Sequence, residues 1–224
     1  MKILYKFASR SRPEKFIKCI ENISINQNHE DYLIFATLDT DDLSMNNEDM
    51  IEKMKLYPKL YVTWGKSDNK IHAINRDMEL APDFDILINM SDDMLFVEKG
   101  YDKIIIEDML ANFPDLDGVL HYNDGNQFDN VMTMTIYGKP YYDRFKYIYH
   151  PSYISLFADN EQTSVAKQLV KYKYMGDDKI IFKHFHPAWG LSGMDSQYEK
   201  TEARDLWDKD EANHRNRRNK NFDL

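Results

Sequence analysis

Two adjacent carboxylates, Asp92 and Asp93, follow an almost unbroken apolar run over residues 85–90. Like charges at the end of a buried strand repel each other, so the pair requires a compensating cation or a tight hydrogen-bond network. Carboxylate oxygens suit Mg²⁺ or Mn²⁺, and such an ion can bridge to a diphosphate and neutralise the charge on a departing phosphate. The alternative is an acidic turn that caps the next helix and binds nothing.

Three further polar clusters follow other strand candidates. They are residues 9–12, with Ser9, Arg10 and Arg12; residues 39–42, with Asp39 and Asp42; and residues 65–70, ending in Lys70. Basic side chains in such places can bind phosphate or ribose, although Arg10 and Arg12 could equally pair with surface carboxylates. Four clusters of this kind favour a ligand site over four independent turns.

The segments that carry these clusters alternate between strand and helix patterns. Apolar runs predict strands at residues 3–8, 32–38, 60–64 and 85–90, and helical spacing of apolar residues follows them over residues 16–23, 50–57, 71–80 and 100–111. The alternation predicts an α/β fold, with a mixed but mostly parallel sheet flanked by helices. Ligands of such sheets bind outside the carboxyl ends of the strands, so the four clusters should share one pocket.

The second half of the chain has shorter elements. Strand candidates lie at residues 119–122, 131–136 and 180–185, and a helix candidate lies at residues 160–171. In the last strand His184 and His186 flank Phe185 and share one face, an arrangement that strand alternation also produces without any ligand.

Two more features of this half could contact a substrate. A Gly-containing turn at residues 121–127 carries Asp124 and Asn126, which could form hydrogen bonds to a ligand or could simply favour the turn. Trp189, shortly after the histidines, could line a ligand site or fill the core.

The composition fits one globular domain. The 224 residues carry 29 Lys and Arg against 38 Asp and Glu, a formal net charge of −9, and 42% are hydrophobic, which excludes wholesale disorder. The acidic balance argues against a protein that coats nucleic acid non-specifically.

A single cysteine, Cys19, permits no internal disulfide, and no run approaches the ~20 apolar residues that span a bilayer. We therefore expect a soluble, untargeted protein in a reducing cytoplasm.

Over about residues 1–190 the order of motifs resembles the GT-A fold of nucleotide-sugar glycosyltransferases, especially family 2-like members, and the close of the chain is similar to compact phage-type members. Residues 7–13 resemble their first-strand loop, 38–42 the acidic end of the second strand, and 70–76 a helix start near the donor. Residues 88–94 stand where these enzymes have an Asp-x-Asp metal motif, 156–161 resemble the motif with the catalytic base, and 183–187 resemble a late histidine motif.

The resemblance implies roles for individual side chains. Donor binding would involve Ser9, Arg10, Arg12, Asp39, Asp42, Lys70, Arg76 and Asp92. Asp92, Asp93, His184 and His186 would hold Mn²⁺ or Mg²⁺, Asp159 or Glu161 would be the catalytic base, and Asp124, Asn126 and Trp189 would bind the acceptor.

Two departures from the family pattern leave alternatives open. Met90 or Ser91 occupies the first position of a strict Asp-x-Asp motif, so the metal could rest on Asp92 or Asp93 and on either histidine. The second acidic motif reads Asp-Asn-Glu, so Asp159 and Glu161 compete for the role of base.

The resemblance also divides the chain. Residues 1–200 would form a single GT-A catalytic domain, with a nucleotide-sugar-binding half at 1–115 and an acceptor and metal half at 116–200. Residues 201–224 are poor in large apolar side chains and are expected as a charged tail, whose basic groups include Arg215, Arg217, Arg218 and Lys220. These groups could contact acceptor phosphates or remain solvated.

The implied activity is metal-dependent transfer of a hexose or pentose from a nucleotide sugar to an acceptor hydroxyl, and the candidate base favours inversion. A UDP-sugar is the favoured donor. The acceptor is either a glycan or a hydroxymethylated base in phage DNA, and a phage enzyme would act in the host cytoplasm. The alternatives are a nucleotidyltransferase, which would use the same paired carboxylates, and a non-catalytic sugar- or nucleic-acid-binding module of the same fold.

Overall fold

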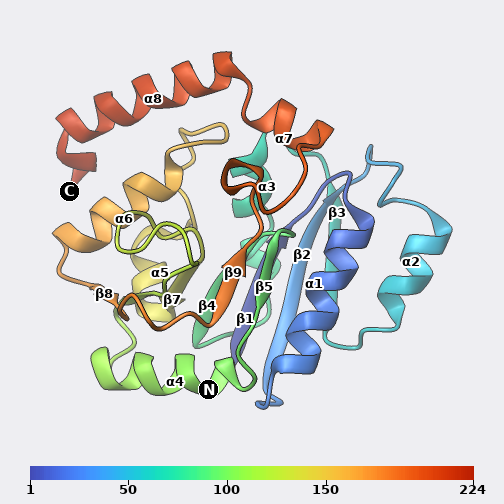
Figure 1. Cartoon of the computed structure of the whole chain (residues 1–224), viewed down its shortest axis with the longest axis horizontal. Helices are drawn as coiled ribbons and strands as arrows, with labels where there is room; N and C mark the ends of the chain where they lie inside the picture. Colours follow the sequence, from blue (N-terminus) through green and yellow to red (C-terminus); the bar gives the residue numbers. More distant parts are fainter.

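A seven-stranded sheet forms the centre of the computed structural model, which describes all 224 residues (Figure 1). The strands are β1 (Ile3–Ala8), β2 (Tyr32–Asp39), β3 (Leu60–Gly65), β4 (Ile86–Met90), β5 (Met94–Phe96), β6 (Val119–His121), β7 (Thr135–Gly138), β8 (Tyr172–Tyr174) and β9 (Phe182–His184). The sheet has the order β3-β2-β1-β4-β7-β6-β8, and only β7 runs antiparallel to its neighbours. Strands β5 and β9 form a separate two-stranded sheet.

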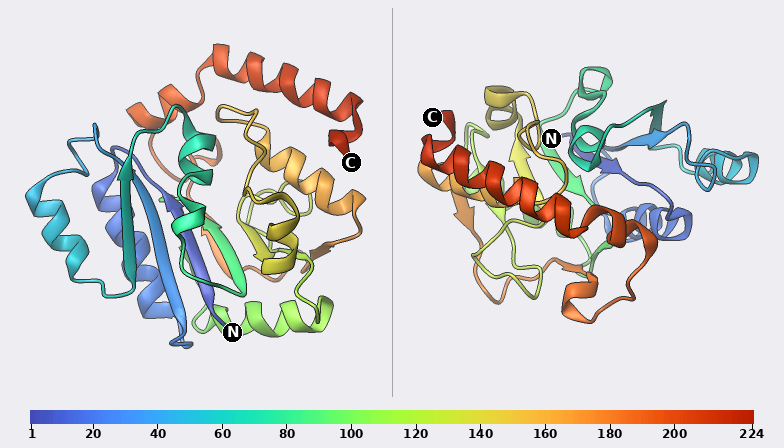
Figure 2. Two further views of the ribbon diagram at one scale, coloured as in Figure 1. Left: turned by 180° about the vertical axis from the view of Figure 1, so that it is seen from behind. Right: turned by 90° about the horizontal axis from the view of Figure 1, so that it is seen from above.

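Helices cover both faces of the central sheet (Figure 2). They are α1 (Pro13–Asn26), α2 (Glu48–Lys55), α3 (Lys70–Asn75), α4 (Tyr101–Asn112), α5 (Lys139–Phe145), α6 (Ala158–Gln168), α7 (Ser196–Thr201) and α8 (Arg204–Asn219), with short 3-10 turns η1 (Met78–Leu80), η2 (Pro187–Trp189) and η3 (Asn221–Asp223). One apolar core joins the sheet to α1, α2 and α4, and a second joins its other face to α3, α5 and α6. None of these helices combines the length and apolar character needed to cross a membrane.

The parallel register brings the polar clusters of the first half to one edge of the sheet. Strand β1 pairs with β2 up to Ala8↔Thr37 and with β4 up to Phe7↔Met90. The three strands end together because their partners are in register, so the loops that follow them begin side by side. The predicted α/β fold, a mostly parallel sheet flanked by helices, is confirmed.

The small sheet joins the second half of the chain to this edge. Met94 of β5 pairs with His184 of β9, and the backbone amide of Phe185 donates to the carbonyl of Asp93 at 2.7 Å. The strand that carries the histidine is thereby fixed beside the adjacent carboxylates.

Some element boundaries differ from the sequence prediction. Strand β7 begins at Thr135 rather than at residue 131. Helix α3 ends at Asn75 because Arg76 is extended and Asp77 is left-handed, with φ 65°. Strands β5 and β8 have three residues each, too few for a side-chain period to be visible in the sequence.

The segment expected as a charged tail contains helix α8 instead. Its outer face carries ion pairs with i,i+4 spacing, between Arg204 and Asp208 at 2.9 Å and between Asp205 and Lys209 at 3.3 Å. Such exposed pairs each contribute only a few tenths of a kcal/mol. The helix therefore depends on its inner face, where Asp210 is 1% exposed.

Lys6 is an unusual member of the second core. Its side chain is fully buried, and Nζ donates to Thr37 Oγ1 at 2.7 Å without a carboxylate partner. Burial lowers the pKa of Lys6 to about 7. A buried ammonium without a counter-ion costs folding free energy, so this residue opposes stability at neutral pH.

Substitution of Lys6 by Met is therefore expected to raise the free energy of unfolding at pH 7 by about 1–3 kcal/mol. At Lys6 the unfolded chain binds more protons than the native one between about pH 7 and 10.5. The free energy of unfolding of the wild type should therefore rise with pH over this range. Urea denaturation should therefore show a smaller difference in free energy of unfolding between Lys6→Met and the wild type at pH 9 than at pH 7. A Leu4→Met variant of the same strand face is the control, and a destabilised Lys6→Met protein would contradict the expectation.

Candidate active site

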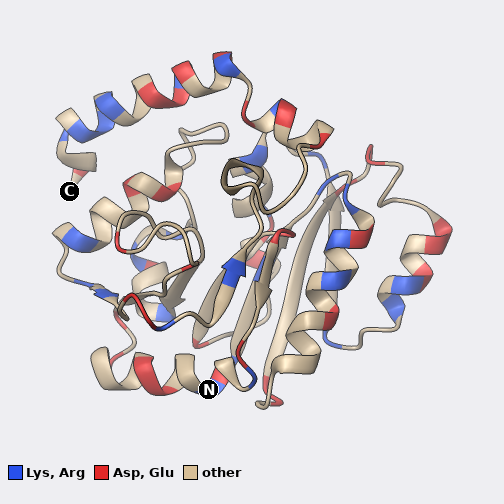
Figure 3. Cartoon of the chain, in the orientation of Figure 1, with Lys and Arg blue, Asp and Glu red and all other residues tan.

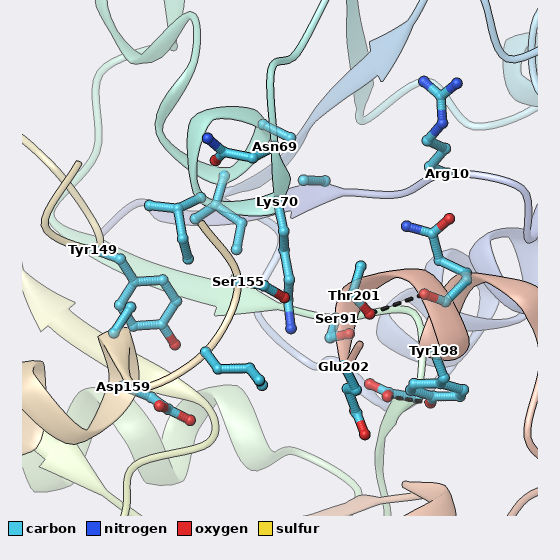
Figure 4. Close-up of a pocket in the computed structure, with 18 of the residues that line it drawn as sticks. Arg10, Asn69, Lys70, Ser91, Tyr149, Ser155, Asp159, Tyr198, Thr201 and Glu202 are labelled. Carbon is cyan, nitrogen blue, oxygen red and sulfur yellow. Dashed lines mark hydrogen bonds between the residues drawn. The ribbon is translucent and has the colours of Figure 1, made fainter. Parts of the chain in front are cut away.

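A cavity of about 790 Å³ opens at the carboxyl ends of the central strands (Figure 4). All four predicted polar clusters contribute to its wall, as do residues of α6, η2, α7 and α8. Of the seven buried side-chain polar atoms that lack a hydrogen-bond partner, five belong to lining residues: Arg12 Nε, Asn89 Oδ1, Asp93 Oδ1, Ser155 Oγ and His184 Nδ1. Unpartnered buried polar atoms are rare in folded proteins, so this concentration indicates a site for a polar ligand.

Asp92 is committed to contacts within the protein. One oxygen accepts from Ser9 Oγ at 2.7 Å, and the other accepts from Arg12 Nη1 at 2.9 Å. Burial raises the pKa of Asp92, with the charge of Asp93 adding to the effect and Arg12 opposing it. Both oxygens are thus already used for hydrogen bonds.

Asp93 has a different environment. Its Oδ2 accepts from the Tyr198 hydroxyl at 2.5 Å and lies 3.3 Å from His184 Nε2, whereas Oδ1 is buried without a partner. Burial would raise the pKa of Asp93, but His184 and Tyr198 together lower it below the ordinary value. Asp93 is therefore an ionised carboxylate with one oxygen available.

The two histidines also differ. His186 has both ring nitrogens engaged, with Nδ1 accepting from the Ala188 amide at 3.2 Å and Nε2 lying 2.7 Å from Glu202 Oε1. His184 lies between Asp93 and Asp124, whose Oδ2 is 3.7 Å from Nδ1. Burial opposes protonation of His184, yet these two carboxylates raise its pKa to about 9.

The residues present fit a divalent cation held by two protein ligands. No group of three or more His, Cys, Asp or Glu side chains is arranged to hold a metal. The free Asp93 Oδ1 offers an oxygen, and the neighbouring imidazole of His184 would offer a nitrogen after release of the proton that Asp93 and Asp124 stabilise; this donor set suits Mn²⁺. The remaining ligands would have to come from a bound phosphate group and water.

Arg12 ties this region to helix α7. Its guanidinium bridges Asp92 and Asp195, at 2.9 and 2.8 Å, and lies 3.8 Å from the centroid of the Tyr198 ring. Asp195 also caps α7 by accepting from the amides of residues 197 and 198. The guanidinium of Arg12 is therefore held in a fixed orientation against Asp92 and the Tyr198 ring.

The cluster around Asp39 forms another part of the wall. Asp39 accepts from Arg10 at 2.8 Å and from the Ser67 hydroxyl at 2.7 Å, and Arg76 approaches it at 3.3 Å from behind the wall. Asp42 does not line the cavity; it accepts from the Ser11 amide at 2.6 Å. The predicted donor residues thus divide into cavity-lining residues and residues that support them.

Asp159 and Glu161, at the start of α6, point to different places. Asp159 lines the same cavity as Lys70 and Ser155 (Figure 4), and burial raises the pKa of Asp159 while the charge of Lys70 opposes the shift. Glu161 is 3% exposed and does not line the cavity, because Arg217 binds both of its oxygens, at 2.6 and 2.9 Å. Only Asp159 can meet a ligand in the cavity directly.

The predicted acceptor residues are also separated. Trp189 lines the cavity and is 41% exposed. Asp124 and Asn126 do not line the cavity. Asp124 accepts hydrogen bonds from the backbone amides of Asn126 and Gln127, both at 2.8 Å. Asp124 thus holds its own turn and faces His184.

Several residues that line the cavity were not assigned a role in the sequence analysis. They include Asn89, Ser155, Tyr198, Glu202 and Trp207. The N-cap position of Asp195 is a local signal that could have identified α7. The other residues reach the cavity only through long-range packing.

Solved glycosyltransferases share this fold. The mannosyltransferase PcManGT from Pyrobaculum calidifontis, in complex with GDP-Man and Mn²⁺, matches with a TM-score of 0.62 and 12% sequence identity over 79% of this chain and 54% of that chain. S. aureus TarS 1-349 matches with a TM-score of 0.60 and 14% identity over 82% of this chain and 60% of that chain. The complex of TarS 1-349 with UDP-GlcNAc matches with a TM-score of 0.60 and 15% sequence identity over 82% of this chain and 58% of that chain.

The comparison defines the class of fold. The chain has the mixed α/β architecture of GT-A glycosyltransferases, and it spans 54–60% of the length of these three chains. No protein-family profile matches the sequence. No curated protein sequence matches it either.

Proposed function

We propose that this protein is a glycosyltransferase that moves a sugar from a nucleotide-sugar donor to an acceptor hydroxyl. The observation that carries the proposal is the cavity itself. On a GT-A fold, it brings a carboxylate with a raised pKa, Asp159, together with the basic side chains Arg12 and Lys70 and with the Asp93–His184 pair.

The donor would bind along the ends of β1, β2 and β4. The side chains around Asp39 offer hydrogen bonds to a ribose or base, and Arg12 and Lys70 supply positive charge for the diphosphate. Lys70 has no ion pair or hydrogen bond of its own and extends into the cavity (Figure 4). We propose a UDP-sugar as donor; two of the structural neighbours carry GDP-Man and UDP-GlcNAc.

Asp93 and His184 would hold Mn²⁺ or Mg²⁺. When bound, the ion would neutralise charge on the diphosphate as it leaves. Arg12, which pairs with the adjacent Asp92 and with Asp195 and lies over the Tyr198 ring, would orient the groups next to this position. Asp92 orients Arg12 rather than binding the ion, since both of its oxygens are engaged.

Asp159 would act as general base. It would accept the proton of the acceptor hydroxyl as the oxygen forms its bond to the anomeric carbon and the bond from that carbon to the phosphate oxygen breaks. A base on the acceptor side of the sugar is consistent with inversion. The raised pKa of Asp159 makes it a stronger base than an exposed carboxylate, provided that the pH keeps it ionised.

The cavity rim favours a glycan as acceptor over DNA. Along α8 the acidic side chains lie mainly in the first half and the basic ones gather in the last turns (Figure 3), where Arg218 and Lys220 have no ion pair but do not line the cavity. Nucleic-acid binding requires unpaired cations that can replace counterions. At the cavity rim the partly exposed rings of Trp189 and Trp207 offer apolar faces to a sugar.

Thermal unfolding with a panel of nucleoside diphosphates and nucleotide sugars, each with and without Mn²⁺, tests the proposal. A ligand at 100 times its Kd should add about 2.7 kcal/mol, which corresponds to roughly 5–10 °C in Tm for a chain of this size. We expect such a shift with one nucleotide family, larger with Mn²⁺, followed by turnover when glycans are added. Metal-independent binding without turnover would indicate a non-catalytic module, and no shift with any compound would overturn the donor site.

A further inference from the structure

Helix α8 crosses the carboxyl edge of the sheet and lies along α6 (Figure 1). Asp210, His214 and Arg217 follow at intervals of four and three residues, which places them on one face of the helix. This face contacts α6 and the loop before it, here called the 154–157 loop. Three of the outer cations of α8, Arg204, Lys209 and Arg215, pair within the helix, and the contacts with α6 and the 154–157 loop come from its inner face.

Asp210 is a buried carboxylate without a cation. Its two oxygens accept from three consecutive backbone amides, those of Ile154 at 2.9 Å, Ser155 at 2.7 Å and Leu156 at 2.8 Å. Charge-assisted hydrogen bonds of this kind are short and directional. They hold the 154–157 loop in one conformation and orient Ser155, whose side chain lines the cavity.

A second contact holds the start of α6. Arg217 binds both oxygens of Glu161, and the Tyr153 hydroxyl donates to Glu161 Oε2 at 2.8 Å while lying 3.1 Å from His214 Nδ1. Glu161 follows Asp159 by two residues on the same helix. The first turn of α6 is therefore clamped from the side opposite the cavity.

Phe157, between these two contacts, has strained backbone geometry. Its φ is 63°, in the left-handed region that side chains with a Cβ rarely adopt. Such a conformation costs of order 1–3 kcal/mol and persists only where the surroundings impose it. The Phe157 ring lies 5.0 Å from the ring of Trp207 and 5.8 Å from that of His214, so α8 covers the strained residue.

We infer that Asp210 and the Arg217–Glu161 pair are positioning residues that hold Asp159 and Ser155 in the cavity. The inference rests on the proposed function, because it assigns these groups to the placement of the proposed base. None of the three lines the cavity, so their action passes through the 154–157 loop and the first turn of α6. A displacement of about 1 Å in a reacting group can cost on the order of 100-fold in rate.

The test compares Asp210→Asn with Asp208→Asn, a matched change on the exposed face of α8. In Asp210→Asn the amides of residues 154–156 should exchange hydrogen faster. We expect kcat to fall about 10- to 100-fold while the Kd for the nucleoside diphosphate changes less than twofold. Asp208→Asn should change none of these quantities. If Asp210→Asn does not fold, Glu161→Gln serves instead, with an expected kcat loss of about tenfold and partial recovery in Glu161→Asp.

The outcomes separate the inference from the function on which it rests. Absence of wild-type turnover with every donor and acceptor would overturn the proposed function and the positioning role together. Wild-type turnover that Asp210→Asn retains in full would overturn the positioning role alone. Equal losses of kcat and nucleotide affinity would also overturn it, because they would mean general disruption of the cavity.

Discussion

Replacement of Asp159 by Asn is expected to lower kcat about 1,000-fold, within the range of 10²–10⁴ that general-base catalysis contributes. The amide is similar in size to the carboxylate but cannot accept the hydroxyl proton, so nucleotide binding and Tm should change little. Steady-state release of nucleoside diphosphate in the presence of acceptor measures the effect. The wild-type rate should fall as the pH is lowered toward the raised pKa of Asp159, and the residual rate of the variant should lack this acid limb.

Glu161→Gln provides the comparison for this prediction. Glu161 is bound by Arg217 and lies outside the cavity, so its loss should reduce kcat far less than the loss of Asp159. The Glu161 variant should also lose stability, because Arg217 would keep its buried charge without a full counter-ion. An Asp159→Asn protein with full turnover, or a larger loss in Glu161→Gln, would show that the base is assigned to the wrong residue.

Replacement of Asp93 by Asn is expected to weaken the Mn²⁺-dependent binding of nucleotide at least about 100-fold. The change removes the ionised oxygen that lies buried without a partner, which is the strongest metal donor in the cavity. Thermal shifts with and without Mn²⁺, and Mn²⁺ titration followed by electron paramagnetic resonance, measure this loss.

Neighbouring substitutions make the metal prediction specific. His184→Gln should weaken the response to Mn²⁺, whereas His186→Gln should leave it in place, because His186 is committed to Glu202 and the Ala188 amide. Asp92→Asn should lower stability through Arg12 more than it lowers metal affinity. A normal Mn²⁺ response in Asp93→Asn would contradict the assignment of the ligand.

The elements that the sequence predicted well are those with strong local patterns. Strands β1, β2 and β4 are apolar runs buried on both faces, and each ends at a polar cluster. Helix α8 was not predicted from the sequence because its residues form no apolar stripe. Its attachment depends on Asp210 and Arg217, charged residues that local patterns assign to solvent.

The sequence identified pairs of candidate residues and could not choose within them. In each pair one member is engaged by a distant partner: Asp92 by Arg12, His186 by Glu202, and Glu161 by Arg217. The other members, Asp93, His184 and Asp159, line the cavity, and Asp93 Oδ1 and His184 Nδ1 have no hydrogen-bond partner. These partnerships join residues far apart in the chain, so no spacing or composition within a motif contains them.

The single cysteine gives a practical means of following the edge of the sheet that carries Asp92 and Asp93. Cys19 is 1% exposed on α1, and its Sγ lies 3.3 Å from the carbonyl oxygen of Met94, directly after the carboxylate pair. Burial raises the pKa of its thiol well above the ordinary value, so the native protein should be almost inert to alkylating reagents. Any slow alkylation then reports how often α1 and the Asp92–Asp93 segment separate, and ligands that close this edge should slow it. A cysteine introduced on the cavity rim could also be labelled selectively in the unaltered background.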